Sequence, residues 1–146
     1  MIALLQRVTQ ASVVIEGDTV AAIKQGLLVL VGIEKNDTES QLLRLAERLL
    51  SYRVFADVDE KMNLDVRQIS GDLILVPQFT LAANTNKGKR PSFSSAAPPV
   101  LGKQLFEQFV TEVSQRYNKV QCGVFGADMQ VQLINDGPVT FWLQVD

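Results

Sequence analysis

Short apolar runs that alternate with polar residues dominate the first third of the chain and predict β-strands. Ile2–Val8 and Ser12–Glu16 have this two-residue period, and Gly17-Asp18 supplies turn residues before a third strand, Thr19–Ile23. Gly26 interrupts the pattern, and the apolar, β-branched run that follows it ends near Glu34. That run is too short for a buried helix of ordinary length, so it predicts a buried strand.

Two segments have helical periodicity instead. Thr38 and Gln41 form a capping-box pattern, and an apolar stripe follows from Leu42 to Leu50. A second stripe, from Leu101 to Val113, follows Pro98-Pro99. The remaining apolar runs predict strands at Val54-Phe55, Leu73–Val76, Val120–Val124, Met129–Ile134 and Val139–Val145. This order favours an α+β fold, or a mixed-sheet α/β fold, with two helices packed on a curved, barrel-like sheet.

The size and composition of the chain fit one globular domain, residues 1–146. Hydrophobic residues make up 47% of the sequence and charged residues 21%. No apolar run approaches the roughly 20 residues that span a bilayer. Residues 1–7 lack the basic start and the cleavage site of a signal peptide. We therefore expect a cytoplasmic protein with no membrane partner.

The chain contains no histidine and a single cysteine, Cys122. An internal disulfide, a histidine-based catalytic triad and the usual His/Cys zinc sites are therefore excluded. The carboxylates of Asp57, Asp59 and Glu60 form a cluster typical of a solvated turn, so we expect no metal and no cofactor. The net charge of −2 indicates that any site for a polyanion is local.

Pro77–Leu81 is the first of three segments where chemistry could occur. Gln78 and Thr80 follow a buried strand, which is a common position for functional groups. They could equally be ordinary residues at the end of a strand. On local sequence alone the ordinary interpretation is favoured, because a Gln-x-Thr pattern carries little information.

The second segment, Asn84–Phe93, concentrates the cations Lys87, Lys89 and Arg90 around a glycine. Cations, hydroxyls and backbone amides are the groups that contact phosphate and sugar in nucleic acids. A solvated charged loop is the commoner role of such a run. Phe93 within this polar loop favours a functional role, although it could simply anchor the loop to the core.

The third segment, Asn135–Trp142, contains Gly137-Pro138 between two predicted strands. A turn is the plain interpretation. Proline has no backbone N–H, which leaves the Gly137 and Pro138 carbonyls free to point outward. Only about 5–6% of X-Pro bonds in folded proteins are cis, so a cis bond here would be a specific device for aiming this backbone.

Together these segments resemble the D-aminoacyl-tRNA deacylase family over essentially the whole chain. Each matching phrase is weak alone, but their order and spacing are specific. The phrases are Ala3–Val8, Lys61–Leu64, Gln78–Leu81, Arg90–Phe93, Gly126–Val131 and Asn135–Leu143. One departure is Pro77, where the family has Ser in its Ser-Gln-Phe-Thr phrase. It removes one hydroxyl and one backbone donor, and we expect activity to survive.

The resemblance implies a homodimer in which Gly137-Pro138 of each subunit, joined by a cis bond, enters the active site of the other. It implies hydrolysis of the ester between a D-amino acid and the 3′ end of tRNA, releasing both. We expect the Gly137 and Pro138 carbonyls to hold the substrate amino group and to exclude an L side chain. Glycyl-tRNA, which has no side chain to exclude, is an expected second substrate, including glycine mischarged on tRNA(Ala).

Under this hypothesis the catalytic residues are Gln78, Phe79 and Thr80. Thr80 could attack as a nucleophile, although no activating base is evident. Alternatively, the terminal ribose hydroxyl of the tRNA activates water, and the protein supplies positioning and N–H donors; we favour this route. The acceptor-stem contacts are predicted to come from Lys87, Lys89, Arg90 and Arg7.

Two other classes of function stay open at this point. One is a non-catalytic module that binds RNA ends. The other is a hydrolase of free D-amino-acid esters. Neither explains why the Gln-Phe-Thr and Gly-Pro segments occur together at this spacing.

Overall fold

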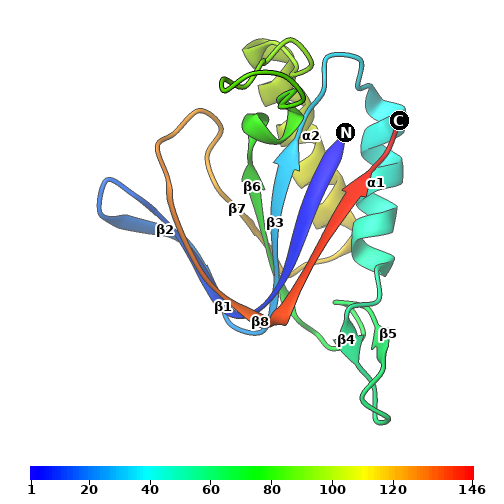
Figure 1. The fold of residues 1–146 in the computed structure, drawn as a ribbon. Coiled ribbons are helices and arrows are strands. Elements are labelled where there is room, and N and C mark those ends of the chain that lie inside the picture. The colour runs from blue at the N-terminus through cyan, green and yellow to red at the C-terminus, as the bar shows by residue number, and fades with distance from the viewer.

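The computed structural model describes all of residues 1–146 and shows one curved sheet with both long helices on the same face (Figure 1). The predicted fold class is confirmed, including the two helices and the mixed, barrel-like sheet. In chain order the elements are β1 (Ile2–Ile15), β2 (Asp18–Ile23), β3 (Gly26–Gly32), α1 (Glu39–Ser51), β4 (Phe55–Ala56), β5 (Met62–Leu64), β6 (Asp72–Pro77), the 3-10 turn η1 (Phe79–Ala82), α2 (Pro99–Arg116), β7 (Val120–Cys122) and β8 (Gln130–Gln144).

The sheet is curved at β1, because the two halves of this long strand pair with different neighbours. The order is β2-β1-β3-β6-β7, and β8 pairs with β1 along both halves of its length. The first half of β1 lies between β3 and β8, and its second half lies between β2 and β8. The β3–β6 and β6–β7 pairs are parallel, whereas the pairs made by β1 are antiparallel.

A side-chain amide joins the edge strands β2 and β7 of the curved sheet. Gln121 on β7 accepts a hydrogen bond from the Ala22 N–H at 2.8 Å and donates one to the Ala22 carbonyl at 2.9 Å. The amide thus makes the pair of bonds that a peptide group of a neighbouring strand would make. The space enclosed is filled by a small core of Val8, Ala11, Val13, Ala21, Ile23, Leu28, Ile74 and Val76.

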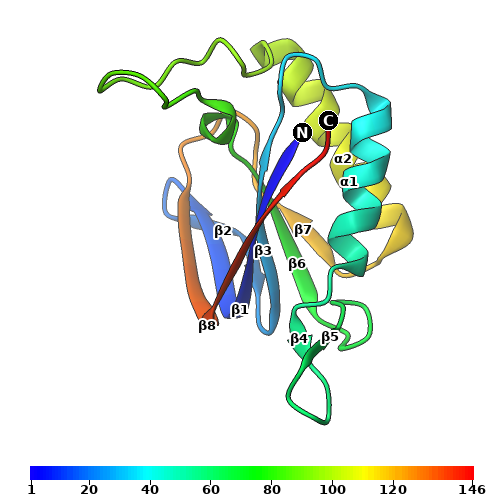
Figure 2. The same cartoon turned by 45° about the vertical axis from the view of Figure 1, so that its right-hand side comes forward.

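The larger core lies between the other face of the sheet and the two helices. The capping box is present, because the Thr38 hydroxyl accepts from the Ser40 N–H and the Gln41 side chain accepts from the Thr38 N–H. Pro99 opens α2, where a missing N–H costs nothing. Figure 2 shows the two helices packed side by side against this face. Neither helix is long and apolar enough to cross a bilayer.

Two predicted boundaries are wrong. The predicted strands Ile2–Val8 and Ser12–Glu16 are one strand, β1, which ends at Ile15, and Met129–Ile134 and Val139–Val145 are one strand, β8, which runs from Gln130 to Gln144. The chain does not reverse at Asn135–Pro138. Both halves of β8 pair with the bent β1, so this segment bulges instead: Gln6 faces Thr140 while Val8 faces Asn135.

Candidate active site

The Gln78–Thr80 segment lies where β6 leaves the sheet. The Gln78 N–H donates to the Val31 carbonyl at 2.8 Å and fixes the start of η1 against β3. The space between η1 and the end of β3 is tight at Gly32. A Cβ on Gly32 would lie 3.0 Å from the Leu81 Cβ and 3.3 Å from the Gln78 carbonyl oxygen. The close approach of η1 to the end of β3 therefore depends on Gly32.

The polar groups of this segment face outward. Thr80 is exposed, Gln78 is half-buried, and the Gln78 amide donates a hydrogen bond to the Thr80 hydroxyl oxygen. The first hydrogen bond within η1 comes from the Leu81 N–H, so the N–H groups of Phe79 and Thr80 have no acceptor inside the turn. The segment offers two backbone donors and a hydroxyl whose proton is free to donate.

The cationic loop is tied to this segment by aromatic packing. The Phe79 and Phe93 rings are 5.2 Å apart at their centroids and tilted by 52°. Asn84 and Ser92 exchange backbone hydrogen bonds of 2.7 and 3.0 Å, which closes the loop between them. The loop side chains are exposed, including all three predicted tRNA contacts, Lys87, Lys89 and Arg90. The structure therefore brings these cations to the same end of the molecule as Thr80.

An apolar cleft adjoins Gln78 and was missed by the sequence analysis. Its walls include Ile33, Pro77, Ala97, Phe106 and Phe125. Gly102 on α2 makes room for the Phe125 ring, because a Cβ there would lie 3.2 Å from it. No signal in the sequence distinguishes these residues from ordinary core positions, since they come from four separate segments.

Gly137-Pro138 lies at the opposite end of the sheet. The peptide bond between them is cis, as expected, and Gly137 has a φ of +126°. Arg7 lies opposite the bulge: its Nε donates to the Asp136 carbonyl at 3.1 Å and lies 3.4 Å from the Asp136 carboxylate. Its Nη1 donates to the Val54 carbonyl at 2.8 Å. Arg7, a predicted tRNA contact, is thus only 16% exposed and lies beside Gly137, away from the cationic loop.

Strand register separates the two segments within one chain. Arg7 pairs with Leu27, whereas η1 packs on Gly32, five residues further along β3. At about 3.4 Å per residue this is roughly 17 Å along the strand. Figure 1 shows η1 at one end of the sheet and the bend of β8 at the other. Gly137-Pro138 therefore does not reach Thr80 of its own chain.

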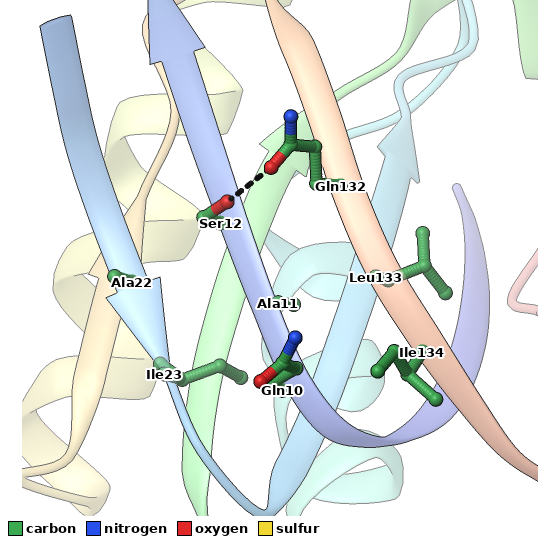
Figure 3. A pocket seen from close by; sticks show the side chains of 8 residues that line it. All are labelled: Gln10, Ala11, Ser12, Ala22, Ile23, Gln132, Leu133 and Ile134. Atoms are coloured by element: carbon green, nitrogen blue, oxygen red, sulfur yellow. Dashed lines mark hydrogen bonds between the residues drawn. The ribbon is translucent and has the colours of Figure 1, made fainter.

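An open hollow elsewhere on the sheet has little chemistry to offer. It has a volume of about 450 Å³ and lies on β1, β2 and the first half of β8 (Figure 3). Its polar groups are those of Gln10, Ser12 and Gln132, and it contains no ionisable side chain. Cys122 is half-buried, and burial raises the pKa of its thiol, which weakens it as a nucleophile near neutral pH.

Solved structures reproduce this architecture over the full chain. One is named "c-Myc DNA Unwinding Element Binding Protein"; it is 36% identical, has a TM-score of 0.96, and the match covers 100% of this chain and 99% of that one. Another, "Structural Analysis of a probable eukaryotic D-amino acid tRNA deacylase", has a TM-score of 0.88 at 16% identity, covers 99% and 98% of the two chains, and supports the fold alone.

Sequence comparisons define the family. The family model described as D-Tyr-tRNA(Tyr) deacylase matches residues 4–144. Relatives named D-aminoacyl-tRNA deacylase include those of Nitrosococcus oceani (59% identical, covering 99% of this chain and 94% of the relative), Cellvibrio japonicus (53%, covering 100% of both) and Proteus mirabilis (57%, covering 99% and 100%). The molecule is thus a hydrolase by class. More narrowly, the chain belongs to the D-Tyr-tRNA(Tyr) deacylase family.

Proposed function

We propose that residues 1–146 form one deacylase domain that hydrolyses the ester of D-aminoacyl-tRNA in the cytoplasm. The observation that carries this proposal is the full-length similarity to relatives named D-aminoacyl-tRNA deacylase. The site geometry is compatible with it. Gln78, Phe79 and Thr80 present donors on an open surface, and an apolar cleft lies beside Gln78.

The second element of the proposal is a homodimer with Gly137-Pro138 of each subunit in the other's site. The strand register keeps Gly137-Pro138 away from Thr80 of the same chain, so in this proposal a second copy of the chain supplies the Gly137-Pro138 segment that lies beside Thr80. A two-fold dimer makes the insertion reciprocal and gives two equivalent sites. The sheet also has an unpaired edge at β8, where Trp142 is 49% exposed and Ile134 is 52% exposed.

Chiral selection then follows from main-chain geometry. The Gly137 and Pro138 carbonyls hold the substrate amino group and occupy the space that an L side chain would need. A D side chain projects toward solvent, so its identity matters little, and glycyl-tRNA, including glycine mischarged on tRNA(Ala), is also a substrate. A fixed backbone discriminates better than an apolar pocket, which distinguishes one methylene by only about 1–3 kcal/mol.

For the chemical step we propose substrate assistance. The Gln78 amide occupies a lone pair of the Thr80 hydroxyl, so this hydroxyl is placed to donate a hydrogen bond. The Phe79 and Thr80 N–H groups stabilise the negative charge that develops on the carbonyl oxygen of the ester when water attacks. The 2′- or 3′-hydroxyl next to the ester helps to activate water, and Lys87, Lys89 and Arg90 contact the acceptor stem.

Labelled D- and L-tyrosyl-tRNA test the proposal with purified dimer at catalytic concentration. We expect many turnovers with the D substrate and resistance of the L substrate. Equal cleavage of both would refute the chiral filter. Thr80→Ala separates the two chemical routes: retained turnover supports substrate assistance, and near-total loss in a folded protein supports a Thr80 nucleophile.

A non-catalytic nucleic-acid-binding module is the second candidate. The 36% identical structure is named as a protein that binds a DNA element, and this similarity favours keeping the candidate. Stoichiometric binding of tRNA with no release of amino acid would establish it. Cleavage of a free D-tyrosine ester as fast as the tRNA-linked ester would point instead to a metabolic esterase.

A further inference from the structure

The β4–β5 hairpin is a preformed projection at the end of the sheet where β8 bends (Figures 1 and 2). One carboxylate, that of Asp57, accepts hydrogen bonds from the Asp59 N–H at 2.9 Å, the Lys61 N–H at 3.0 Å and the Asn63 amide at 2.8 Å. The bond from Asn63 also lowers the pKa of Asp57, and the three bonds to its carboxylate hold the turn closed. The hairpin therefore presents its tip in one shape.

The tip carries two exposed apolar side chains. Val58 is 98% exposed and Met62 is 47% exposed. Asp59 and Glu60 lie beside them and are exposed as well. None of these four residues takes part in the packing of the two hydrophobic cores. The tip thus combines an apolar contact surface with negative charge.

Arg7 couples this hairpin to the segment proposed to enter the other subunit. Its guanidinium donates to the Val54 carbonyl at the base of the hairpin and to the Asp136 carbonyl beside Gly137. Because one rigid group holds both, the two projections keep a fixed relation to each other. The base of the hairpin at Val54 therefore lies beside Gly137-Pro138, and the tip projects from the same end of the sheet (Figure 1).

The surface next to the candidate active site carries charge opposite to that of the hairpin tip. The Asn84–Phe93 loop directly follows η1, and Phe93 packs on Phe79 within the candidate site. This loop carries three exposed cations, whereas the turn from Asp57 to Lys61 carries three carboxylates and one lysine. Opposite charges on facing surfaces fix register and favour the correct partner.

We propose that the hairpin residues 57–62 of each subunit contact the Asn84–Phe93 loop of the second copy and hold its cations in position for tRNA. This inference rests on the proposed dimer. It adds a second element that each subunit lends to the other's site. The hairpin residues are positioning residues, because they act on the tRNA through the loop.

Cross-linking tests the contact directly. In a Cys122→Ser background, protein carrying Val58→Cys is mixed and exchanged with protein carrying Lys89→Cys, and then oxidised mildly. We expect a disulfide-linked heterodimer on a non-reducing gel. Lys24→Cys replaces Lys89→Cys as the control, since Lys24 lies in the β2–β3 turn at the opposite end of the sheet from η1.

Kinetics test the consequence. Neutralising the tip with Asp59→Asn and Glu60→Gln removes negative charge, so bulk electrostatics alone predicts tighter tRNA binding. The proposed contact predicts the reverse: a KM for D-aminoacyl-tRNA raised at least threefold, with kcat within twofold. Glu39→Gln with Glu107→Gln, which removes the same charge from the helices, should leave KM unchanged or lower it.

The outcomes separate this inference from the proposed function. A dimer by light scattering that cleaves the D substrate, yet forms no Val58–Lys89 cross-link and shows no rise in KM, overturns the hairpin contact alone. A protein that is monomeric overturns the shared site and the contact together. A cross-link at Lys89 but not at Lys24, with the rise in KM, supports the contact.

Discussion

Arg7 has two possible roles, and replacing it with lysine distinguishes them. Lysine keeps the positive charge but not the planar fork of donors. In the structure the fork joins two carbonyls, at 3.1 Å for Asp136 and 2.8 Å for Val54. A single ammonium at the end of a flexible stem cannot reproduce that bridge. If bracing is the main role, Arg7→Lys should therefore behave much like Arg7→Ala.

The magnitude follows from these contacts. A hydrogen bond from a charged donor contributes about 1.5–3 kcal/mol, and lysine keeps at most one of the two. Arg7 is only 16% exposed, so solvent weakens these bonds little. We expect Arg7→Lys to lower the free energy of unfolding by about 1.5–3 kcal/mol and Arg7→Ala by more. The Gly137 backbone should also lose its fixed position, because the Arg7 Nε donates to the carbonyl of the preceding residue, Asp136.

The assay combines urea unfolding, followed by the fluorescence of the only tryptophan, Trp142, with rates on D- and L-tyrosyl-tRNA. Bracing predicts lower stability and a smaller D/L ratio for both variants, with the salt dependence of tRNA binding unchanged. A phosphate contact predicts that Arg7→Ala reduces the slope of log affinity against log salt by about 0.7–0.9, while Arg7→Lys preserves affinity. Arg7→Lys with native stability and native selectivity would refute the bracing argument.

Three further predictions concern stability. Asp37→Asn should cost about 1.5–3 kcal/mol in urea unfolding, because the buried Asp37 carboxylate accepts from the Met1 ammonium at 2.6 Å and from the Glu34 N–H at 2.7 Å, while the Glu34 carboxylate, 2.7 Å from the same ammonium, keeps that charge paired in the variant. Glu107→Gln, at an exposed ion pair, should stay within about 1 kcal/mol, and equal effects would contradict this assignment. Gln121→Ala should lower the free energy of unfolding by about 1–3 kcal/mol and speed hydrogen exchange at the Ala22 amide, because both bonds to Ala22 are lost. An unchanged exchange rate at Ala22 would show that the Gln121 amide does not hold the two edge strands together. Burial, and then the charges of Asp72 and Asp65, raise the pKa of Tyr117 above 10.0, so the folded state holds the phenol proton more tightly than the unfolded state does. The free energy of unfolding should therefore fall as pH rises from about 10 through the folded-state pKa, and Tyr117→Phe should remove this pH dependence.

The sequence predicts what is encoded locally. The capping box at Thr38 and the apolar stripe of α1 depend on residues a few positions apart, and both are present. Gln78 and Thr80 are two residues apart, so their proximity also follows from the sequence. The elements that were missed, β5 and η1, are three and four residues long and too short for a periodic pattern.

Features that depend on distant partners could not be predicted in this way. The continuity of β8 through Gly137-Pro138 follows from its pairing with both halves of a bent β1. Arg7 meets Val54 and Asp136 across 47 and 129 residues of sequence. In the sequence, Arg7 is simply a cation followed by an apolar residue, and this pattern gives no indication of its partners. The same is true of Phe125 and Gly102, which reach the Gln78 cleft from separate elements.

Pro77 stands where the family phrase has serine, and strand geometry shows which hydrogen bond it removes. The Leu73 N–H and the Leu75 carbonyl both face β7, so odd-numbered residues of β6 face that side, and a donor at position 77 would face it too. The Gln78 N–H faces β3 and keeps its bond to Val31. The ladder with β7 ends at Gly123, where a Cβ would be in ordinary contact with the Pro77 Cδ at 3.5 Å but only 2.7 Å from the Met129 Sδ, so this glycine makes room for Met129.

The hydrogen bond that Pro77 cannot make is therefore the last one between β6 and the edge strand β7, away from the bond that positions Gln78 and Thr80. We expect Pro77→Ser to change kcat/KM for D-tyrosyl-tRNA by less than about threefold, because the donors of η1 keep their anchor. Phe79→Ala, which removes the ring that packs on Phe93, serves as a positive control for disturbance of the site. A gain of tenfold or more in Pro77→Ser would refute this expectation and would mean that the hydroxyl of residue 77, in the wall of the cleft beside Gln78, contacts the substrate directly.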